Sequence, residues 1–485
     1  MADQPNILLV MSDQHNRRVM GCAGDDVIRT PNLDRLAQNG VRFTSCYTPS
    51  PLCLPARMSF LTSRYPSDQR VWTNSCILDS NIPTFAHQLS LAGYETVLTG
   101  RMHFVGHDQH HGFEKRQVGS LTAQFPGGPG PDLGEIPLDS TGQSRLAVEV
   151  SGRGRTAYQV YDQQVTDEAI RFMNERDDRR PFAMVVGYIL PHCPFISRVD
   201  LYDQYIDKVG VPEVPEGHFE SVHPFVQQSR QHRGITDLKD TEIRSARAGY
   251  YGIVSMLDEN VGRIMDALEK SGLDRNTIVI YASDHGEMAG DHGMWWKSSF
   301  YEGSAGVPLI VSCPGRFGQG RTVDRVTSLV DIGPTLLDLA GARPLPRSRG
   351  TSLRDFLQGD SDQVPGWPDE TFSEHCPNRG DRASCMIRSG PWKLNHFHGY
   401  ETVQLFNIED DPDEWHDLGQ DPAHADIRDE LRGRLLARWD GDAVERECER
   451  LCRDVEILDD WGRTVQPGSP GLWRAPPGSN VFPGE

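Results

Sequence analysis

The chain has 485 residues and a formal net charge of −20, because 69 acidic residues outnumber 49 basic ones. This balance argues against nucleic acid and against an anionic membrane surface as partners, since both attract clustered cations. Hydrophobic residues form 37% of the chain, enough for a folded core. The apolar run at residues 7–11 is far shorter than the about 20 residues that a bilayer requires, and no basic segment precedes it. We therefore expect a cytoplasmic globular protein whose ten cysteines are mostly free thiols.

Short apolar runs alternate with helical patterns through most of the chain. The first helix should follow the N-cap residue Thr30 and stop before Gly40. In chain order, the expected elements are a strand at Asn6–Met11, helices at Pro31–Ala37 and Pro83–Leu91, strands at Tyr94–Thr99 and Phe182–Ile189, a long helix at Thr241–Ser271, and strands at Thr277–Tyr281 and Val307–Ser312. Continuous apolar strands between helices predict the α/β class, with a large, mainly parallel sheet covered by helices on both faces.

The C-terminal region has a different pattern. Alternating residues with turn signals between them predict a small antiparallel sheet that begins near Thr371, and a helix follows it. The strands and the helix of this unit are expected at Cys385–Arg388, Trp392–Phe397, Val403–Phe406 and Ala423–Trp439. The Pro- and Gly-rich segment after it is expected either to pack in extended form across a neighbour or to be partly disordered.

We therefore expect three parts in the chain: an α/β domain at 1–370, a small α+β subdomain at 371–460 and a tail at 461–485. One long stretch of the first part, residues 117–155, contains a Pro/Gly-rich run beginning at Phe125 and should be an irregular loop. Long loops of this kind often form the rim of a functional site.

Polar residues follow two of the expected strands. Asp13 and Gln14 come after the first strand, and Asp284 and His285 come after the strand at Thr277–Tyr281. Ligands bind at the carboxyl ends of parallel strands, and oxygen donors with one imidazole suit Ca²⁺, Mg²⁺ or Mn²⁺. Each of these residues could instead shape a turn or cap the next element.

Cys53 stands immediately before an expected helix at Pro55–Leu61, whose first turn accommodates the proline. This position places its side chain at the positive end of the helix dipole. Arg57 lies one helical turn further on and can reach the same point. A helix N-terminus with an arginine favours an anion site, whereas the alternative is a buried structural cysteine.

The pattern Cys53-x-Pro55-x-Arg57 resembles the signature by which type I sulfatases have their cysteine oxidised to formylglycine. Further blocks are similar to sulfatases, and several of them to the choline-sulfatase and phosphonate monoester hydrolase branch. They are Asn6–Gln14, Thr30–Ala37, Ser50–Cys53, Asn81–Leu89, Gly100–Glu114, Asp284–Glu287 and Lys297–Val311. The resemblance implies the alkaline-phosphatase-like fold and a sulfatase that hydrolyses a sulfate monoester of a small molecule.

The resemblance also implies the residues of the site. The ligands of one divalent cation, with Ca²⁺ favoured and Mn²⁺ or Mg²⁺ as alternatives, would be Asp13, Gln14, Cys53 as formylglycine, Asp284 and His285. The catalytic residues would be Cys53, Arg57, His103, His192 and Lys297, and the substrate-binding residues Asn74 and Arg101. Taken singly, a histidine here could be a hydrogen-bonded scaffold residue and the lysine a surface charge.

The mechanism implied by the family uses the formylglycine aldehyde as a hydrated diol. One hydroxyl attacks sulfur, and His192 or Lys297 protonates the departing alcohol. The second hydroxyl loses its proton to His103, and sulfate is expelled. Arg101 stands where the family usually has lysine, and a guanidinium can bind an oxyanion but cannot donate a proton. The expected partners are a formylglycine-generating enzyme during maturation and further copies of the chain, in a homo-oligomer.

Two other functions remain open at this point. A phosphonate monoester or phosphodiester hydrolase on the same scaffold shares the cysteine signature and the metal ligands, and a non-catalytic protein could use the pocket only to bind anions. Choline sulfatases hold the substrate ammonium with aromatic residues, but no Trp lies between Trp72 and Trp295. Phe125, Tyr158 or Tyr161 could substitute, so the alcohol is not identified.

Overall fold

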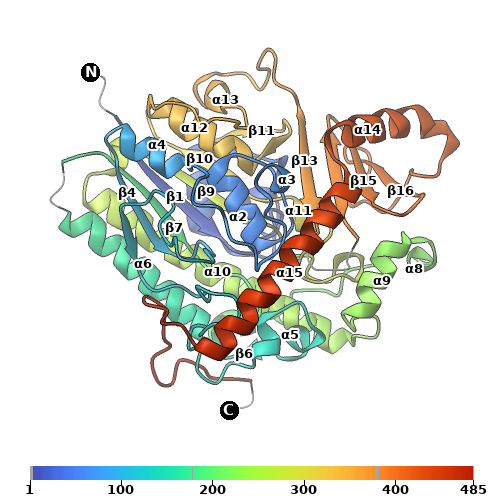
Figure 1. Cartoon of the computed structure of the whole chain (residues 1–485), viewed down its shortest axis with the longest axis horizontal. Helices are drawn as coiled ribbons and strands as arrows, with labels where there is room; N and C mark the ends of the chain where they lie inside the picture. Colours follow the sequence, from blue (N-terminus) through green and yellow to red (C-terminus); the bar gives the residue numbers. More distant parts are fainter. Residues whose placement is uncertain (1–3, 177–178, 377–381, 484–485) are drawn as a thin grey trace.

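The computed structural model describes residues 4–176, 179–376 and 382–483 (Figure 1). Its centre is an eight-stranded sheet, as expected from the buried apolar runs. In spatial order the strands are β11 (Arg321–Val323), β2 (Gly40–Phe43), β10 (Leu309–Ser312), β9 (Thr277–Ser283), β1 (Asn6–Ser12), β7 (Phe182–Gly187), β4 (Glu95–Gly100) and β5 (Lys115–Gln117). Only β10 runs antiparallel to its neighbours, so the prediction of a mainly parallel sheet is confirmed.

Helices cover both faces of this sheet. Leu8 and Val10 of β1 point into the core under one helical layer, and Ile7, Leu9 and Met11 point into the core under the other. The first layer contains α6 (Ala157–Glu175) and α10 (Asp240–Lys270), and the second contains α2 (Cys53–Thr62), α4 (Phe85–Leu91) and α12 (Ile332–Leu339). α1 (Pro31–Gln38) follows the expected N-cap, Thr30.

Shorter elements connect these layers. The helices among them are α3 (Pro66–Gln69), α5 (Arg145–Glu149), α7 (Val199–Tyr205), α8 (His218–Ser221), α9 (Pro224–His232), α11 (Glu302–Ala305) and α13 (Arg354–Gln358), and the two-residue strands are β3 (Cys46–Tyr47), β6 (Gly152–Arg153), β8 (Ile196–Ser197) and β12 (Thr327–Ser328). The expected irregular loop at 117–155 thus contains α5, β6 and a 3₁₀ turn at Leu138–Thr141. Among the described residues, none of the helices combines the length and apolar character needed to cross a bilayer.

A four-stranded antiparallel sheet forms the C-terminal unit. It has the order β13 (Glu370–His375), β14 (Ser384–Ser389), β15 (Trp392–Phe397) and β16 (Val403–Asn407), and α14 (Ala425–Arg438) packs on it. α15 (Gly441–Val465) then crosses the front of the molecule from this sheet towards α5 and β6 (Figure 1).

The expected boundary at 460/461 falls inside α15, a helix that was not predicted, because the tail was expected from its Pro and Gly content alone. Gly462 lies within the helix, where a Cβ would come within 2.1 Å of the Pro126 carbonyl oxygen. Glycine is therefore needed for close approach to the loop at residues 126–128, and the helix continues to Val465.

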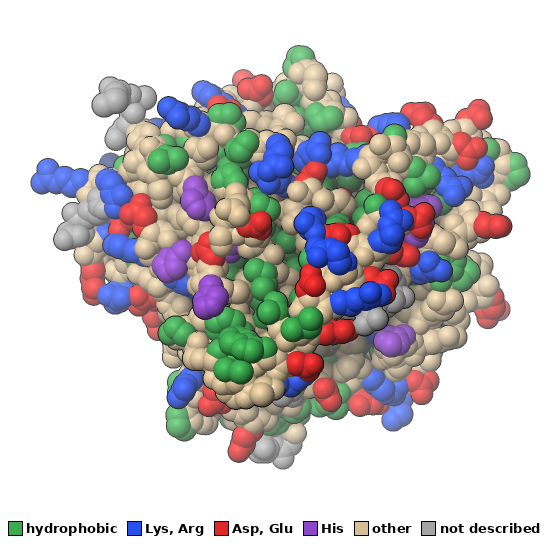
Figure 2. All heavy atoms as spheres, viewed as in Figure 1, with side chains coloured by type: hydrophobic (Ala, Val, Ile, Leu, Met, Phe, Trp, Pro, Cys, Tyr) green, Lys and Arg blue, Asp and Glu red, His purple; other side chains and the backbone are tan. Residues whose placement is uncertain are grey.

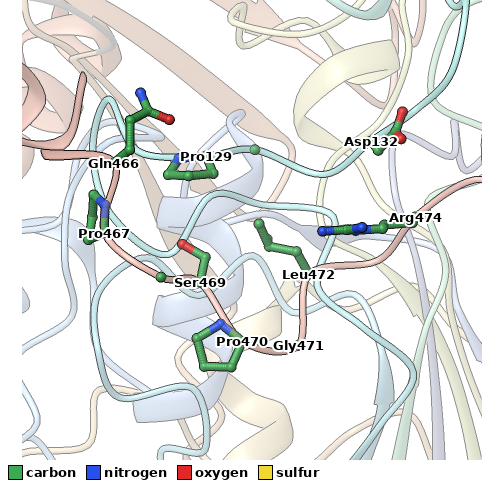
Figure 3. A pocket seen from close by; sticks show the side chains of 11 residues that line it. Pro129, Asp132, Gln466, Pro467, Ser469, Pro470, Gly471, Leu472 and Arg474 are labelled. Carbon is green, nitrogen blue, oxygen red and sulfur yellow. The ribbon is translucent and has the colours of Figure 1, made fainter. Parts of the chain in front are cut away.

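The tail from Gln466 runs extended along this chain's own long loop. Single β-bridges join Leu472 to Ser120, Arg474 to Asp132 and Val481 to Arg155. A pocket of about 640 Å³ lies between residues 129–132 and 466–474 (Figure 3). Residues 484–485 of the expected tail lie outside the described part. The described tail is ordered, because its polar backbone is paired with the loop.

Candidate active site

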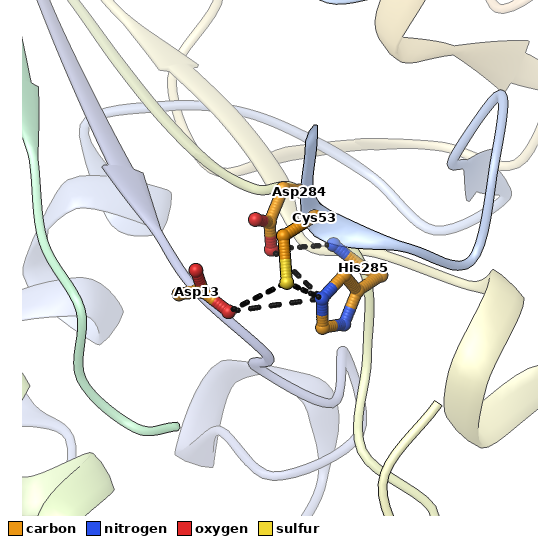
Figure 4. Close-up of side chains that lie close together, drawn as sticks. All are labelled: Asp13, Cys53, Asp284 and His285. Carbon is orange, nitrogen blue, oxygen red and sulfur yellow. Dashed lines mark hydrogen bonds and ion pairs between the residues drawn. The ribbon is translucent and has the colours of Figure 1, made fainter. Parts of the chain in front are cut away.

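The site lies where the central strands end. β1 and β9 are parallel neighbours with Ser12 opposite Ser283, so Asp13 and Asp284 follow them side by side. Cys53 is the first residue of α2, and its side chain is directed at these carboxylates (Figure 4). The Cys53 Sγ atom lies 3.7 Å from Asp13 Oδ1 and 3.1 Å from His285 Nε2. All four side chains are buried.

The donor set fits a cation. One ligand atom from each of Asp13, Cys53, Asp284 and His285 lies within 4.8 Å of the others. His285 Nδ1 lies 3.0 Å from the Gly286 carbonyl, so this nitrogen carries the proton and Nε2 presents its lone pair. That lone pair faces Asp13 Oδ1 at 3.7 Å and Asp284 Oδ1 at 3.6 Å, and burial lowers the pKa of His285. Electron-rich atoms facing one another in this way call for a divalent ion between them.

Two guanidinium groups balance the carboxylates. Arg57 donates from Nε to Asp284 at 2.7 Å and from Nη2 to Asp13 at 3.1 Å, and Arg101 Nε donates to the same Asp13 oxygen at 2.8 Å. Burial alone would raise the pKa of Asp13, but Arg101, His192, Arg57 and Lys297 hold it well below its ordinary value. Asp13 is therefore an anion at neutral pH, and Arg57 and Arg101 offset the charges of the two carboxylates.

His103 lies beside Arg101, whose Nη2 is 3.1 Å from His103 Nδ1. Because Arg101 can only donate, Nδ1 is the acceptor and the proton of the neutral ring is on Nε2. Burial and the charge of Arg101 lower the pKa of His103 well below its ordinary value. The ring is thus neutral, with the lone pair of Nδ1 facing Arg101 and an N–H at Nε2.

Lys297 and His192 form a second pair. Lys297 Nζ lies 2.8 Å from His192 Nε2 and donates to Gln14 Oε1 at 2.7 Å. Burial opposes the charge of Lys297, but Cys53 and Asp13 raise its pKa. Burial and Lys297 together lower the pKa of His192, whose Nδ1 lies 2.9 Å from the Cys193 carbonyl. Lys297 is therefore the protonated member of this pair, and His192 is the neutral one.

The remaining sequence-predicted residues, Gln14 and Asn74, also lie at this place. Gln14 follows Asp13 with φ of 72°, and its backbone N–H donates to Asp284 at 3.2 Å. Asn74 Oδ1 accepts the N–H of Leu54 at 3.0 Å, next to Cys53, so its amide caps the first turn of α2. The fold thus brings the predicted site residues together around Cys53, with Asn74 attached through the N–H of Leu54, while their catalytic roles stay predictions.

Part of the long loop at 117–155 lies against this cluster. Gly142 accepts a contact from Cys193 Sγ at 3.6 Å, and Gln143 Nε2 donates to Ser298 Oγ at 3.0 Å. The loop therefore touches the neighbours of both His192 and Lys297.

The three aromatic residues that could contact the substrate, Phe125, Tyr158 and Tyr161, lie in different surroundings. Tyr158 lies beside His192 with ring centroids 6.3 Å apart. Tyr161 is fully buried in the core and donates to the Gly119 carbonyl, so it cannot contact a substrate. Phe125 packs edge-on against Trp461 of α15 at 5.7 Å, a partner that the sequence did not indicate.

Glu287 is a site residue to which the sequence analysis assigned no role. Its carboxylate accepts the side-chain N–H of Gln14 at 2.5 Å. Burial raises the pKa of Glu287 to about 7, and the N–H groups of Ala289, Trp296 and Gln14 oppose this shift. The residue was visible in the Asp284–Glu287 block, but nothing in the spacing pointed to Gln14 as its partner.

Comparisons with known proteins agree with this geometry. The sulfatase family model matches residues 5–342, and a model of the C-terminal part of N-sulphoglucosamine sulphohydrolase matches residues 290–440. Choline-sulfatase of Rhizobium meliloti (strain 1021) is 34% identical over 469 residues, covering 91% of this chain and 88% of that protein. Arylsulfatase of Clostridium perfringens (strain 13 / Type A) is 30% identical over 470 residues, covering 90% of this chain and 95% of that protein.

A solved structure, phosphonate monoester hydrolase of Agrobacterium radiobacter, matches with a TM-score of 0.75 and 27% identity, covering 89% of this chain and 95% of that chain. The architecture is thus the alkaline-phosphatase-like fold implied by the motifs. The family match covers more than half of the chain and includes the whole cluster around Cys53. The chain therefore belongs to the sulfatase family and is a sulfuric ester hydrolase.

Proposed function

We propose that this sulfatase hydrolyses a sulfate monoester of a small molecule with formylglycine, made from Cys53, as its nucleophile. One observation carries the proposal: the Cys53 side chain starts a helix and faces two carboxylates and an imidazole lone pair. An unmodified thiolate there would add negative charge to an already anionic group. The Sγ atom stands where a neutral hydrated carbonyl oxygen would lie, beside the side chains that bind a cation.

The proposed cation ligands are Asp13, Gln14, residue 53, Asp284 and His285. A divalent ion held by them, with Ca²⁺ favoured and Mn²⁺ or Mg²⁺ as alternatives, would acidify a nucleophile hydroxyl and neutralise sulfate charge. The oxygen-rich donor set supports a hard cation. The network around Arg57 supports its part, which is to hold residue 53 and balance both carboxylates.

The protein's own side chains provide the proton transfers. Lys297, positively charged and bonded to His192, is the proposed donor of a proton to the leaving alcohol oxygen. His103, neutral because of burial and Arg101, is the proposed acceptor of the proton from residue 53, which would go to Nδ1, the nitrogen that faces Arg101. Arg101 and Asn74 bind the sulfate oxygens, and Arg101 acts there as a fixed positive charge.

Peptide mass spectrometry across Cys53, followed by a panel of esters, tests the proposal. We expect a mass loss at residue 53 relative to cysteine, in a host that supplies the formylglycine-generating enzyme. We also expect faster turnover of an aryl sulfate than of a phosphonate monoester. An unmodified Cys53 in a protein that turns over sulfate esters at full rate would refute the formylglycine nucleophile.

A second candidate is a phosphonate monoester or phosphodiester hydrolase. The similarity to the Agrobacterium radiobacter structure favours it, because that relative matches at TM-score 0.75. Both substrates carry a compact tetrahedral anion, and the same cations would stabilise the charge that develops on its oxygens during displacement. A kcat/KM for phosphonates above that for every sulfate in the panel would make this the main activity.

We also propose a homo-oligomer in the cytoplasm. Hydrophobic side chains gather on the front face over the lower half of α15 (Figures 1 and 2), where Ile457, Leu458, Trp461 and Val465 are exposed. An apolar patch on a helix is a surface that a second copy can cover. All ten cysteines are free thiols, which suits a reducing compartment. Sedimentation of the purified protein tests the oligomer, and a monomer at micromolar concentration would exclude it.

A further inference from the structure

Glu287 has a buried carboxylate that no cation contacts directly. It follows the proposed metal ligands Asp284 and His285 and is fully buried. Its Oε1 accepts the N–H groups of Ala289 at 2.8 Å and Trp296 at 2.6 Å, and its Oε2 accepts Nε2 of Gln14. Burying a carboxylate costs free energy, so packing alone does not explain the position of Glu287.

The backbone around Glu287 is shaped to present these donors. Ala289 has φ of 48° and Trp296 has φ of 62°, both in the left-handed region that non-glycine residues rarely adopt. The two strained residues direct their N–H groups at one carboxylate oxygen and leave the other for Gln14. Strain of this kind clusters at functional sites.

The hydrogen bonds of Gln14 have only one consistent direction. The Gln14 amide nitrogen donates to Glu287 Oε2, and the bond at the other side of the amide requires this direction. An ammonium can only donate, so the atom facing Lys297 is the amide oxygen, Oε1. Lys297 then donates to Nε2 of His192, and the His192 Nδ1–H donates to the Cys193 carbonyl. The chain of bonds therefore runs outward from the Lys297 ammonium, which can only donate, to Glu287 on one side and to the Cys193 carbonyl on the other.

We propose that Glu287 is a positioning residue, which fixes the orientation of the Gln14 amide so that its oxygen faces Lys297 and the cation site. The inference rests on the proposed function, because it gives Gln14 the part of a metal ligand and Lys297 that of a proton donor. The backbone of Gln14 is held as well, since its N–H donates to Asp284 and its carbonyl accepts the Tyr250 hydroxyl at 3.1 Å. What remains free is the rotation that exchanges Oε1 and Nε2 of the Gln14 amide, and the bond to Glu287 fixes this rotation.

The substitution Glu287→Gln tests this. The introduced carbonyl oxygen stays with the two backbone N–H groups, so the introduced NH₂ faces the NH₂ of Gln14. The Gln14 amide then turns over and presents N–H groups to Lys297 and the cation. We expect Mn²⁺ affinity, measured by calorimetry on metal-depleted protein, to weaken about 10- to 100-fold, with kcat falling more than KM rises.

Exchanging the two side chains distinguishes a positioning role of Glu287 from a role in packing. In the double variant Glu287→Gln with Gln14→Glu, the introduced carboxylate accepts both from the introduced amide and from Lys297. We expect this double variant to regain Mn²⁺ affinity and kcat, while Gln14→Glu alone, which places two carboxylates together, loses both. If Glu287→Gln does not fold, an active double variant still supports the proposal.

Asp331→Asn is the matched control, because Asp331 is a buried carboxylate that accepts two backbone N–H groups away from the site. It should leave Mn²⁺ affinity and kcat unchanged. Unchanged Mn²⁺ affinity in Glu287→Gln, or a double variant no better than either single one, would overturn the proposal. The affinities do not depend on turnover, so they remain informative if Cys53 proves not to be formylglycine.

Discussion

At the scale of single residues, the site is a set of charges that hold one another in place. Arg57 joins Asp13 to Asp284, and both carboxylates face the side chain of Cys53. Arg57, Arg101, Asp13 and Asp284 each have an opposite charge within hydrogen-bonding distance, which offsets the cost of removing them from water. Cys53 differs from its neighbours, since no buried ion pair depends on its side chain.

Cys53→Ala should therefore abolish turnover and leave the fold intact. The substitution removes the proposed nucleophile but no charge, so we expect the free energy of unfolding to change by about 1 kcal/mol. Activity on an aryl sulfate and urea denaturation of the same preparation check this. Near-wild-type activity would reject Cys53 as the origin of the nucleophile.

The sequence was enough to predict which proposed ligand residues lie together, but not how their side chains are oriented. Asp13 and Asp284 could be predicted because each follows a buried strand, and adjacent parallel strands bring their ends together. The direction of the Gln14 amide depends on Glu287, and the position of Glu287 depends on the left-handed backbone at Ala289 and Trp296. No local pattern encodes an arrangement that exists only after folding.

At the scale of elements, an aromatic cluster joins the loop after β9 to the C-terminal unit. The His292 ring stacks on Tyr301 at 4.0 Å and lies 4.1 Å from Trp415, and its Nε2 donates to the Asp413 carbonyl at 2.8 Å. Burial and the nearby His218 lower the pKa of His292 to about 3. The ring is neutral in the folded protein, and its protonation would loosen this contact.

His292→Asn should reduce stability in a pH-dependent way. His292 has φ of 54°, which asparagine tolerates, so the substitution removes mainly the stacking. Between pH 6.5 and about 3 the unfolded chain binds a proton at His292 that the folded chain does not, so wild-type stability is lost as pH falls. The wild-type advantage should shrink by up to about 1.4 kcal/mol per pH unit below 6.5.

Urea titrations of both proteins at pH 7.5, about 6 and about 5 measure this difference. An advantage of wild type that stays constant with pH would show that folding does not lower the pKa of His292.

Element boundaries were predictable where local chemistry marks them. Thr30 and Pro31 mark the start of α1. The end of α15 was not predictable from composition, because Gly462 adds to the Gly content of the tail but lies inside the helix, where it allows close approach to the loop at 126–128. The antiparallel direction of β10 was also hidden, since a continuous apolar run does not encode the direction of its neighbours.

At the scale of the whole molecule, the last part of the chain closes over the first. α15 packs on the loop at 126–128, and the tail pairs with residues 120, 132 and 155. Trp473 anchors this tail: its ring lies 5.2 Å from Tyr161, and its Nε1 donates to Gln164 at 2.7 Å. The tail is therefore part of the main core.

Trp473→Ala should destabilise the protein by about 3 to 5 kcal/mol, the usual cost of deleting a buried aromatic side chain. Trp473→Phe keeps most of the contact with Tyr161 and loses the bond to Gln164, so its cost should be smaller. Thermal and urea denaturation give both values. Equal stability of wild type and Trp473→Ala would mean that the tail contributes nothing to the core.

Removal of the metal should act on the whole molecule as well. A cation that binds only the folded state stabilises it by about 2.7 kcal/mol at a hundredfold excess over Kd. A chelator should therefore lower Tm and stop turnover, and Ca²⁺ or Mn²⁺ should restore both. Full activity and unchanged Tm after exhaustive chelation would exclude the metal site.

The burial of Cys53 also sets an order of events during biosynthesis. With 1% of its side chain exposed, the residue is out of reach of any other protein once the fold is complete. The proposed oxidation therefore belongs to the nascent chain. At about 5 to 20 residues per second, a ribosome needs tens of seconds to deliver the strands and helices that cover this position, and the maturation enzyme has that interval in which to work.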